Sequence, residues 1–218
     1  MRFALPASTY LCGIPLLELI PILLLAGFPG AIGSANARDG TTTRYQSGEE
    51  GIWLDVPYVR QPEDGCGAAC ISMILRYWAG RESSLASQYD TDPLAIAKIL
   101  YTPQVKGIPG TKMEGYMRKQ GFRTFVFAGS LPDLTHHLSL GRPLIVCVKP
   151  ERHHAGLHYL VVAGVDPAAE IILVNDPARR KLLKFNVRSF ESAWAHTRHW
   201  TLLAVPESHS LLNPSPSP

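Results

Sequence analysis

A small set of polar side chains along this sequence has the types and spacing needed for nucleophilic catalysis. Cys66 follows the loop 61–65, and the next residues, Gly67 to Ala79, are apolar on nearly every face, as in a buried helix. At the start of a helix, unsatisfied backbone amides and the positive end of the helix dipole stabilise a thiolate. Gly65 and Gly67 are expected to let a substrate backbone approach the sulfur. Cys66 is therefore the predicted nucleophile.

Gln61 is the candidate for stabilising a negatively charged intermediate. It lies five residues before Cys66, and its side-chain amide can donate a hydrogen bond to an oxyanion. The backbone N–H of Cys66 would be the second donor. A glutamine in a turn is otherwise an ordinary exposed residue, so its position just ahead of the nucleophile carries this prediction. Cys70 and Cys147 lie within apolar runs and are expected to be small core residues. A disulfide between them stays open.

The base must come from one of eight histidines. His158 opens a strand-like run of apolar residues, and a rigid element suits a catalytic base. A lone histidine in a strand is usually structural, so the assignment depends on its neighbour. The other histidines lie on a predicted helix, in loops or in the tail: His136, His137, His153, His154, His196, His199 and His209.

Hairpin geometry supplies a partner for His158. The run that begins at His158 and the next strand-like run form a hairpin whose turn is expected to centre on Ala168. In that register Leu160 lies opposite Asp176, so Asp176 falls on the same face of the sheet as His158. Its carboxylate would hold the tautomer and orientation of the imidazole. Asp166 is expected to be a turn residue. An alternative, that Asp176 is only a turn aspartate before a proline, stays open.

The elements that must position these side chains change type halfway along the chain. Helices are expected first and β-type runs second, which predicts an α+β fold of the papain-like kind: a helical lobe, with a buried central helix, packed on an antiparallel sheet across a cleft. The expected helices are Gly67–Ala79, one beginning at Asp92-Pro93, Thr111–Gln120 and Ser130–Leu140. The expected strands are Ile52–Tyr58, Pro143–Lys149, His158–Val165, Ile171–Asn175, Lys181–Val187 and Trp200–Val205.

The ends of the 218-residue chain differ from its middle. Residues 1–37 combine Arg2, a short apolar run and Ala35-Asn36-Ala37, a pattern typical of a cleaved signal peptide. We therefore expect export to the periplasm or the medium. An uncleaved N-terminal anchor is the alternative, and it would be the protein's membrane attachment. Residues 38–51 are expected to form a flexible lead-in, 52–206 a single catalytic domain and 207–218 a disordered tail.

Composition narrows the classes of function. The net charge of +3 is spread over interspersed charges of both signs, so no basic stripe predicts nucleic-acid binding. The sequence contains no phosphate-binding glycine loop and no zinc-type spacing of cysteine and histidine, so no metal or cofactor is predicted. Removal of residues 1–37 leaves an odd number of cysteines. At least one thiol of an exported chain would then be unpaired within that chain.

Several of these residues also carry a family resemblance. Gln61, the run from Asp64 to Cys70, the run that starts at His158, and Asn175-Asp176-Pro177 resemble the bacteriocin-processing peptidase family, whose papain-like domain also forms the N-terminus of peptide-exporting ABC transporters. The resemblance runs from about Leu54 to Val205. It implies a papain-like fold with oxyanion-hole Gln61, nucleophile Cys66, base His158 and orienting Asp176.

The expected function is hydrolysis of peptide bonds in a peptide or protein substrate, through a thioester, by an exported cysteine peptidase. Exporter members have an additional residue between the glutamine and the cysteine, and no membrane-spanning or ATPase region follows in this sequence. Cleavage after a double glycine is therefore not carried over, and a stand-alone secreted relative is expected. Acyl transfer or cell-wall amide cleavage on the same triad, and an inactive cleft that binds peptides, remain alternatives.

Overall fold

The computed structural model describes residues 51–82, 89–149 and 156–207. The predicted signal peptide, residues 38–50 of the lead-in and residues 208–218 of the tail lie outside the described residues, as do His153, His154 and His209. Within the described ranges, no helix combines the length and the apolar character that crossing a membrane requires.

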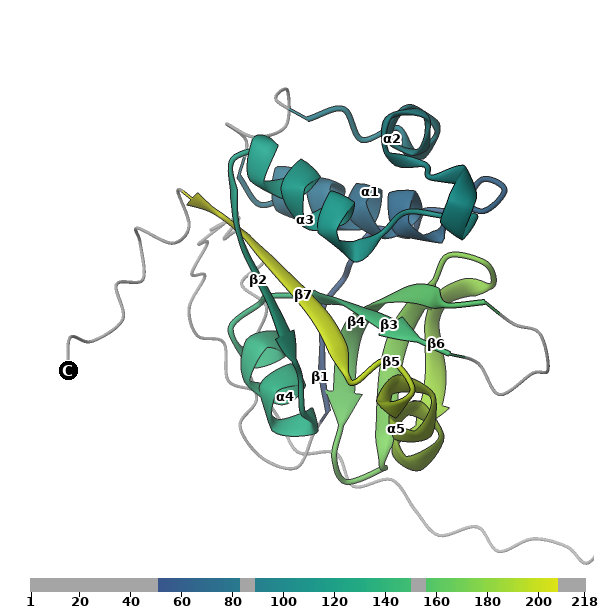
Figure 1. The fold of residues 1–218 in the computed structure, drawn as a ribbon. Helices are drawn as coiled ribbons and strands as arrows, with labels where there is room; N and C mark the ends of the chain where they lie inside the picture. The colour runs from purple at the N-terminus through teal and green to yellow at the C-terminus, as the bar shows by residue number, and fades with distance from the viewer. Residues whose placement is uncertain (1–50, 83–88, 150–155, 208–218) are drawn as a thin grey trace, which may run out of the picture. The chain divides into compact units, whose positions relative to one another are not determined.

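Helices and strands of the described residues form two groups (Figure 1). In chain order the elements are β1 (Ile52–Trp53), α1 (Cys66–Ala79), α2 (Pro93–Leu100), the short 3-10 helix η2 (Pro103–Val105), α3 (Gly110–Lys119), β2 (Phe122–Ala128), α4 (Leu131–Ser139), β3 (Leu144–Val148), β4 (His158–Asp166), β5 (Ile171–Asp176), β6 (Arg180–Asn186), α5 (Val187–Ala195) and β7 (Trp200–Pro206). The helices α1, α2 and α3, which we call the helical group, lie together at one end of the sheet. The second group is the sheet itself, with α4 and α5 beside its strands. The α+β prediction is confirmed.

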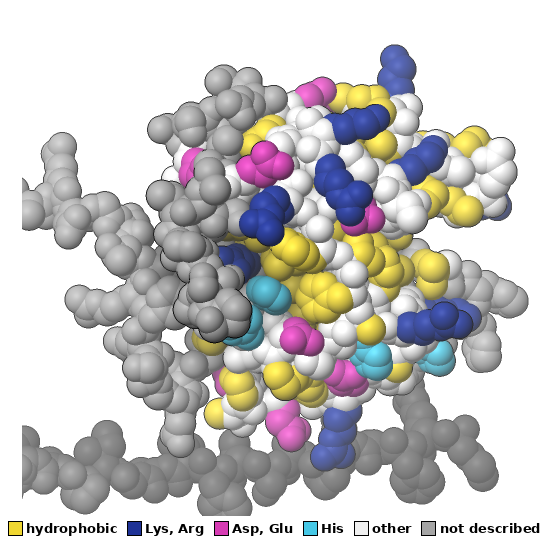
Figure 2. Space-filling view, turned by 60° about the vertical axis from the view of Figure 1, so that its left-hand side comes forward, with side chains coloured by type: hydrophobic (Ala, Val, Ile, Leu, Met, Phe, Trp, Pro, Cys, Tyr) yellow, Lys and Arg dark blue, Asp and Glu magenta, His cyan; other side chains and the backbone are white. Residues whose placement is uncertain are grey.

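The described strands form one sheet in the order β2-β7-β3-β4-β5-β6, and every neighbouring pair is antiparallel. The short β1 pairs with the end of β4 that β3 does not reach. The edge strand β2 exposes Phe125 and Val126, and one face of the molecule carries a band of apolar side chains with basic side chains above it (Figure 2). The centre of the sheet is β3 and β4, so the residues of β4 are held from both sides.

Helix α1 is buried because almost all of its side chains are apolar. Its large residues Tyr77 and Trp78 are about 1% exposed, and the indole N–H of Trp78 donates to the backbone oxygen of Ala204 in β7. The ring of Trp78 is thereby fixed between helix and sheet. Burial of this kind contributes roughly 1.5–3 kcal/mol for each large side chain. The helix is thus anchored firmly enough to hold its N-terminal residue, Cys66, in place.

Local signals in the sequence set several element boundaries correctly. Asp92 caps α2 by accepting from the amides of Leu94 and Ala95, with Pro93 at the first helical position. Ser130 and Asp133 form the reciprocal capping box at the start of α4. Gly121 follows α3 with φ +81°, a left-handed conformation that glycine adopts without strain. These contacts confirm the predicted starts of α2 and α4 and the predicted end of α3.

Three elements were not predicted: the short 3-10 helix η2, strand β2 and helix α5. Strand β2 lies between α3 and α4, so the helices do not all precede the sheet. Helix α5 interrupts the predicted run of strands: Asn186 caps it by accepting from the amide of Arg188, and Phe190 and Trp194, four residues apart, are buried. That cap and spacing were available signals of a helix. The first predicted strand is also shorter than expected, since only Ile52 and Trp53 pair.

Candidate active site

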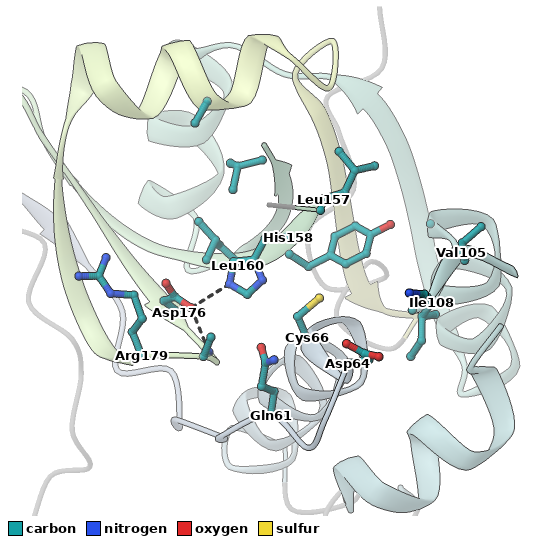
Figure 3. Close-up of a pocket in the computed structure, with 18 of the residues that line it drawn as sticks. Gln61, Asp64, Cys66, Val105, Ile108, Leu157, His158, Leu160, Asp176 and Arg179 are labelled. Carbon is teal, nitrogen blue, oxygen red and sulfur yellow. Dashed lines mark hydrogen bonds and ion pairs between the residues drawn. The ribbon is translucent and has the colours of Figure 1, made fainter. Parts of the chain in front are cut away.

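A cleft of about 1320 Å³ lies between the helical group and the sheet. The helical side contributes Gln61 and Cys66, and the sheet contributes His158 and Asp176. Figure 3 shows His158 between Asp176 and Cys66, with Gln61 beside the sulfur. The four predicted site residues therefore meet at one cleft, although they come from three separate stretches of chain.

His158 and Asp176 are in direct contact across the sheet. Nε2 of His158 lies 2.8 Å from Oδ1 of Asp176, and the two side chains are 19% and 6% exposed. The same carboxylate oxygen accepts from the backbone amide of Ala178 at 3.0 Å. This second bond fixes the carboxylate, because the turn that begins at Asp176 holds the acceptor in the orientation that the imidazole needs.

The strand register that brings the two together includes a bulge. A turn centred on Ala168 would pair Val165 with Ile171, but the structure pairs Val165 with Ile172, so the predicted register is wrong at the turn. Ala163 is an extra residue on β4 that shifts the pairing back by one. Beyond it Val161 pairs with Asn175, which gives the predicted register at the functional end.

Without that bulge the site would not form. A one-residue slip moves every following side chain to the other face of the sheet, so Asp176 would point away from His158. The amide of Leu54, just after β1, donates to the oxygen of the extra residue, Ala163, at 2.7 Å. The bulge is therefore held by the segment of residues 54–65, which joins β1 to α1. The wrong register at the turn and the unpredicted bulge offset each other, so the predicted pairing at Asp176 is right.

The electrostatics of the pair favour a charged imidazole. Burial alone lowers the pKa of His158, but hydrogen bonds to the Asp176 carboxylate and to the Cys66 sulfur, together with their negative charges, raise it to about 9. For Asp176, burial raises the pKa, and the hydrogen bond and charge of His158 outweigh it, so the pKa lies below its ordinary value. At neutral pH the pair is an imidazolium and a carboxylate beside the thiol.

Cys66 is the first residue of α1, as predicted. No side chain caps the start of this helix, so its first amides remain available to a negative group in the cleft. The side-chain Oε1 of Gln61 is buried and has no hydrogen-bond partner among the described residues. This oxygen is an acceptor, so the oxyanion-hole role predicted for Gln61 depends on its Nε2 donor and not on this atom.

The two glycines beside Cys66 make room for neighbouring side chains of the protein. A Cβ on Gly65 would lie 2.5 Å from the ring of Pro62, and a Cβ on Gly67 would contact Ile108 at 3.2 Å. Both positions therefore make room for the protein itself. The prediction that they open a path for a substrate backbone is wrong for Gly65, whose neighbour is the preceding turn.

Among the described residues, the cysteines and histidines other than Cys66 and His158 behave as packing or surface residues. Cys66, Cys70 and Cys147 are all free, so the disulfide left open above does not form. Burial raises the pKa of the Cys70 thiol well above its ordinary value and that of Cys147 to about 12. Of the histidines that the structure describes, His158 is the one that lines the cleft. Asp166 is the last residue of β4, and its side chain accepts from the amide of Ala169 in the turn that follows, so it holds that turn and does not line the cleft.

Sequence reasoning missed the residues that hold the loop before Cys66 against the sheet. The hydroxyl of Tyr58 donates to the backbone oxygens of Asp176 and Pro177, each at 3.3 Å, and the amide of Gln61 donates to the oxygen of Pro177 at 3.0 Å. Contacts between segments more than a hundred residues apart leave no periodic pattern in a sequence. The buried Asn175, one residue before Asp176, was missed as a site residue for the same reason.

The chain matches the model of the Peptidase_C39-like family over residues 53–201. This match covers more than half of the chain and includes all four candidate residues. The chain therefore belongs to the Peptidase_C39-like family, and it is a cysteine peptidase. A search of the curated proteins found no match.

Solved structures show the same fold at low sequence identity. A protein from Bacillus anthracis described as a C39-like peptidase has a TM-score of 0.53 and 18% identity, covering 72% of this chain and 98% of its own. The peptidase domain of Streptococcus ComA, a bifunctional ABC transporter involved in quorum sensing, has a TM-score of 0.55 and 20% identity, covering 70% and 99%. A double-glycine-motif protease from an AMS/PCAT transporter, in complex with a leader peptide, has a TM-score of 0.53 and 17% identity, covering 72% of this chain and 98% of its own. The papain-like fold prediction is confirmed.

Proposed function

We propose that this protein is an exported peptidase that cleaves peptide bonds with Cys66 as nucleophile, His158 as acid and base, and Asp176 as the residue that orients His158. The contact of 2.8 Å between His158 and Asp176, in the cleft that Cys66 also lines, carries the proposal. The raised pKa of His158 supports it, because an imidazolium beside the sulfur favours the thiolate.

The reaction proceeds through a thioester. The Cys66 thiolate attacks the carbonyl carbon, and the side-chain amide of Gln61 and the backbone N–H of Cys66 donate to the oxyanion. His158 gives its proton to the amine as the C–N bond breaks, leaving a thioester and a neutral imidazole. The imidazole then takes a proton from water, whose oxygen attacks the thioester. The C–S bond breaks, and the carboxylic acid, thiolate and imidazolium are released or restored.

The substrate class in this proposal is a peptide or an extended segment of a protein. The leader peptide held by the AMS/PCAT relative supports it, as does the open cleft that runs between the two groups of elements. No nucleic acid, metal or cofactor takes part in the proposed reaction.

A thiol-directed activity probe and a peptide library test the proposal together. Wild-type protein is expected to label at Cys66 and to cleave library peptides, whereas Cys66→Ala and His158→Ala lose cleavage. Cys70→Ala is the matched control, since it removes a buried thiol four residues along the same helix. Labelling without cleavage of any peptide would point to another acyl-transfer reaction, and no labelling to a cleft that only binds.

Export is the second part of the proposal and rests on residues 1–37. Protein isolated from the envelope or medium of the producing cells is expected to begin near Arg38 on N-terminal sequencing. Recovery of the chain from the cytoplasm with Met1 intact would overturn this part and leave the peptidase assignment untouched.

A further inference from the structure

One buried side chain joins the segments that carry the two halves of the site. Asn175 is 0% exposed. Its Nδ2 donates to the backbone oxygen of Val56 at 3.0 Å, and its Oδ1 accepts from the amide of Leu182 at 2.9 Å. A buried amide bonded at both ends is expensive to replace, because its removal leaves two backbone groups without partners. Asn175 therefore links the segment of residues 54–65, which precedes α1, to β5 and β6.

Each linked segment leads directly to a site residue. Val56 is followed within the same extended segment by Gln61, and then by Cys66. On β5 the next residue after Asn175 is Asp176. Because Asn175 pairs with Val161, strand alternation places its side chain on the face of the sheet away from the cleft, and it is absent from the residues that line the cleft. Asn175 thus acts from behind the site.

The bond to Leu182 also fixes the turn after Asp176. Leu182 is an extra residue on β6 and has φ +49°, a left-handed conformation that is unfavourable for leucine. The bulge allows Asp176 to pair with Arg180, which closes the turn whose Ala178 amide holds the Asp176 carboxylate. A strained residue persists only where its surroundings hold it, and Asn175 accepts from its amide.

We propose that Asn175 is a positioning residue for the peptidase reaction: it sets the distance and orientation between the Cys66–Gln61 half of the site and the His158–Asp176 half. The proposal rests on the function proposed above. This role differs from a contribution to stability alone. Without the two hydrogen bonds of Asn175, the protein is expected to fold with the two halves of the site out of alignment.

The proposal is tested by measuring kcat, KM and the alkylation of Cys66 in Asn175→Ala, with Thr201→Val as the control variant. Thr201 is also 0% exposed, donates one hydrogen bond to the oxygen of His199 and lies on β7, so its replacement removes a buried bond away from the cleft. Asn175→Ala is expected to lower kcat/KM about a hundredfold, mainly through kcat, as misplacement of reacting groups does. At neutral pH, iodoacetamide should alkylate Cys66 more slowly than in wild type, since the sulfur loses its aligned imidazolium. Thr201→Val should lower the melting temperature without either change.

Asn175→Asp is the second variant and covers the case in which the alanine variant fails to fold. Its carboxylate still accepts from Leu182, but donation to Val56 requires the protonated form. Its kcat/KM relative to wild type is therefore expected to rise as the pH falls. A ratio that stays constant with pH would overturn the role of Asn175, whether or not the alanine variant folds.

The same measurements separate failure of this inference from failure of the proposed function. If wild-type Cys66 is alkylated no faster than an ordinary thiol, and His158→Ala does not change that rate, the catalytic pair does not exist and the proposed function fails. If wild type behaves as a catalytic pair and the Asn175 variants do too, only the positioning role is lost.

Discussion

At the scale of single residues, the site depends on a carboxylate that fixes an imidazole. Asp176→Asn keeps the shape of the side chain and removes its charge, so the tautomer and charge of His158 are no longer held. We expect kcat/KM to fall by about 10³–10⁴, as in other hydrolases with such a triad, with little change in the circular-dichroism spectrum. Asp166→Asn, on the same strand pair but at the turn, should leave kcat/KM within about twofold of wild type. Equal losses in the two variants would show that Asp176 does not act through His158.

Gln61 tests the oxyanion site separately from the triad. Its replacement by alanine removes one donor to the tetrahedral intermediate, which typically costs about 10²–10³ in kcat with a smaller change in KM. Gln104→Ala is the matched control, because Gln104 also lines the cleft but lies outside the triad and the loop before Cys66. A loss in KM alone for Gln61→Ala would assign this glutamine to substrate binding.

At the scale of elements, the sequence predicts the helix starts and strands that depend on neighbouring residues in the chain. Capping side chains located α2 and α4, the apolar surface of α1 located that helix, and alternation located the strands that carry His158 and Asp176. The bulges at Ala163 and Leu182 could not be predicted, because each depends on pairing between strands and on a contact from another element: Leu54 bonds to Ala163, and Asn175 bonds to Leu182. The right partner for His158 was found although the register at the turn was wrong.

The hairpin between β4 and β5 offers a direct test of backbone strain. Glu170, at its turn, is exposed and has φ +52°. Glu170→Gly removes the unfavourable contact of the Cβ, and this gain exceeds the added entropy of the unfolded chain. We expect the free energy of unfolding to rise by about 0.5–1 kcal/mol, with kcat/KM unchanged because the turn is remote from the cleft. Glu170→Ala keeps the Cβ and should stay within about 0.5 kcal/mol of wild type. Urea denaturation of the three proteins measures the difference, and a loss of stability in the glycine variant would contradict it.

At the scale of the whole molecule, the helical group supplies the proposed nucleophile and the sheet supplies its proposed base, so the site exists only while the two are packed together. The segment of residues 54–65, which joins β1 to α1, connects the two groups directly. It holds the bulge in β4 through Leu54, bonds to the buried Asn175 through Val56, and then carries Gln61 to the cleft. Global stability and the geometry of the site are therefore coupled, and the coupling should be visible in the pH dependence of unfolding.

The sign of that dependence follows from the two pKa shifts. His158 has a pKa of about 9 in the folded protein against 6.5 ordinarily, so its contribution is complete below pH 6.5 and is lost as the pH rises through 9. Asp176 has a lowered pKa, so its contribution is present above pH 3.8 and is lost as the pH falls through the folded value. The pair therefore stabilises the fold most between about pH 4 and 6.5.

Urea denaturation of wild type and His158→Gln from pH 4 to 10 measures this contribution. The difference in free energy of unfolding between the two proteins is expected to shrink by roughly 3 kcal/mol between pH 6.5 and 10, because only the wild type loses the imidazolium. The matched control is His199→Gln, which removes a more exposed imidazole that lies 3.0 Å from Glu191, outside the cleft. If the difference for His158→Gln stays constant or grows with pH, the imidazole is not held in its charged form by Asp176 and Cys66. The cleft would then lack the charge that the proposed thiolate requires.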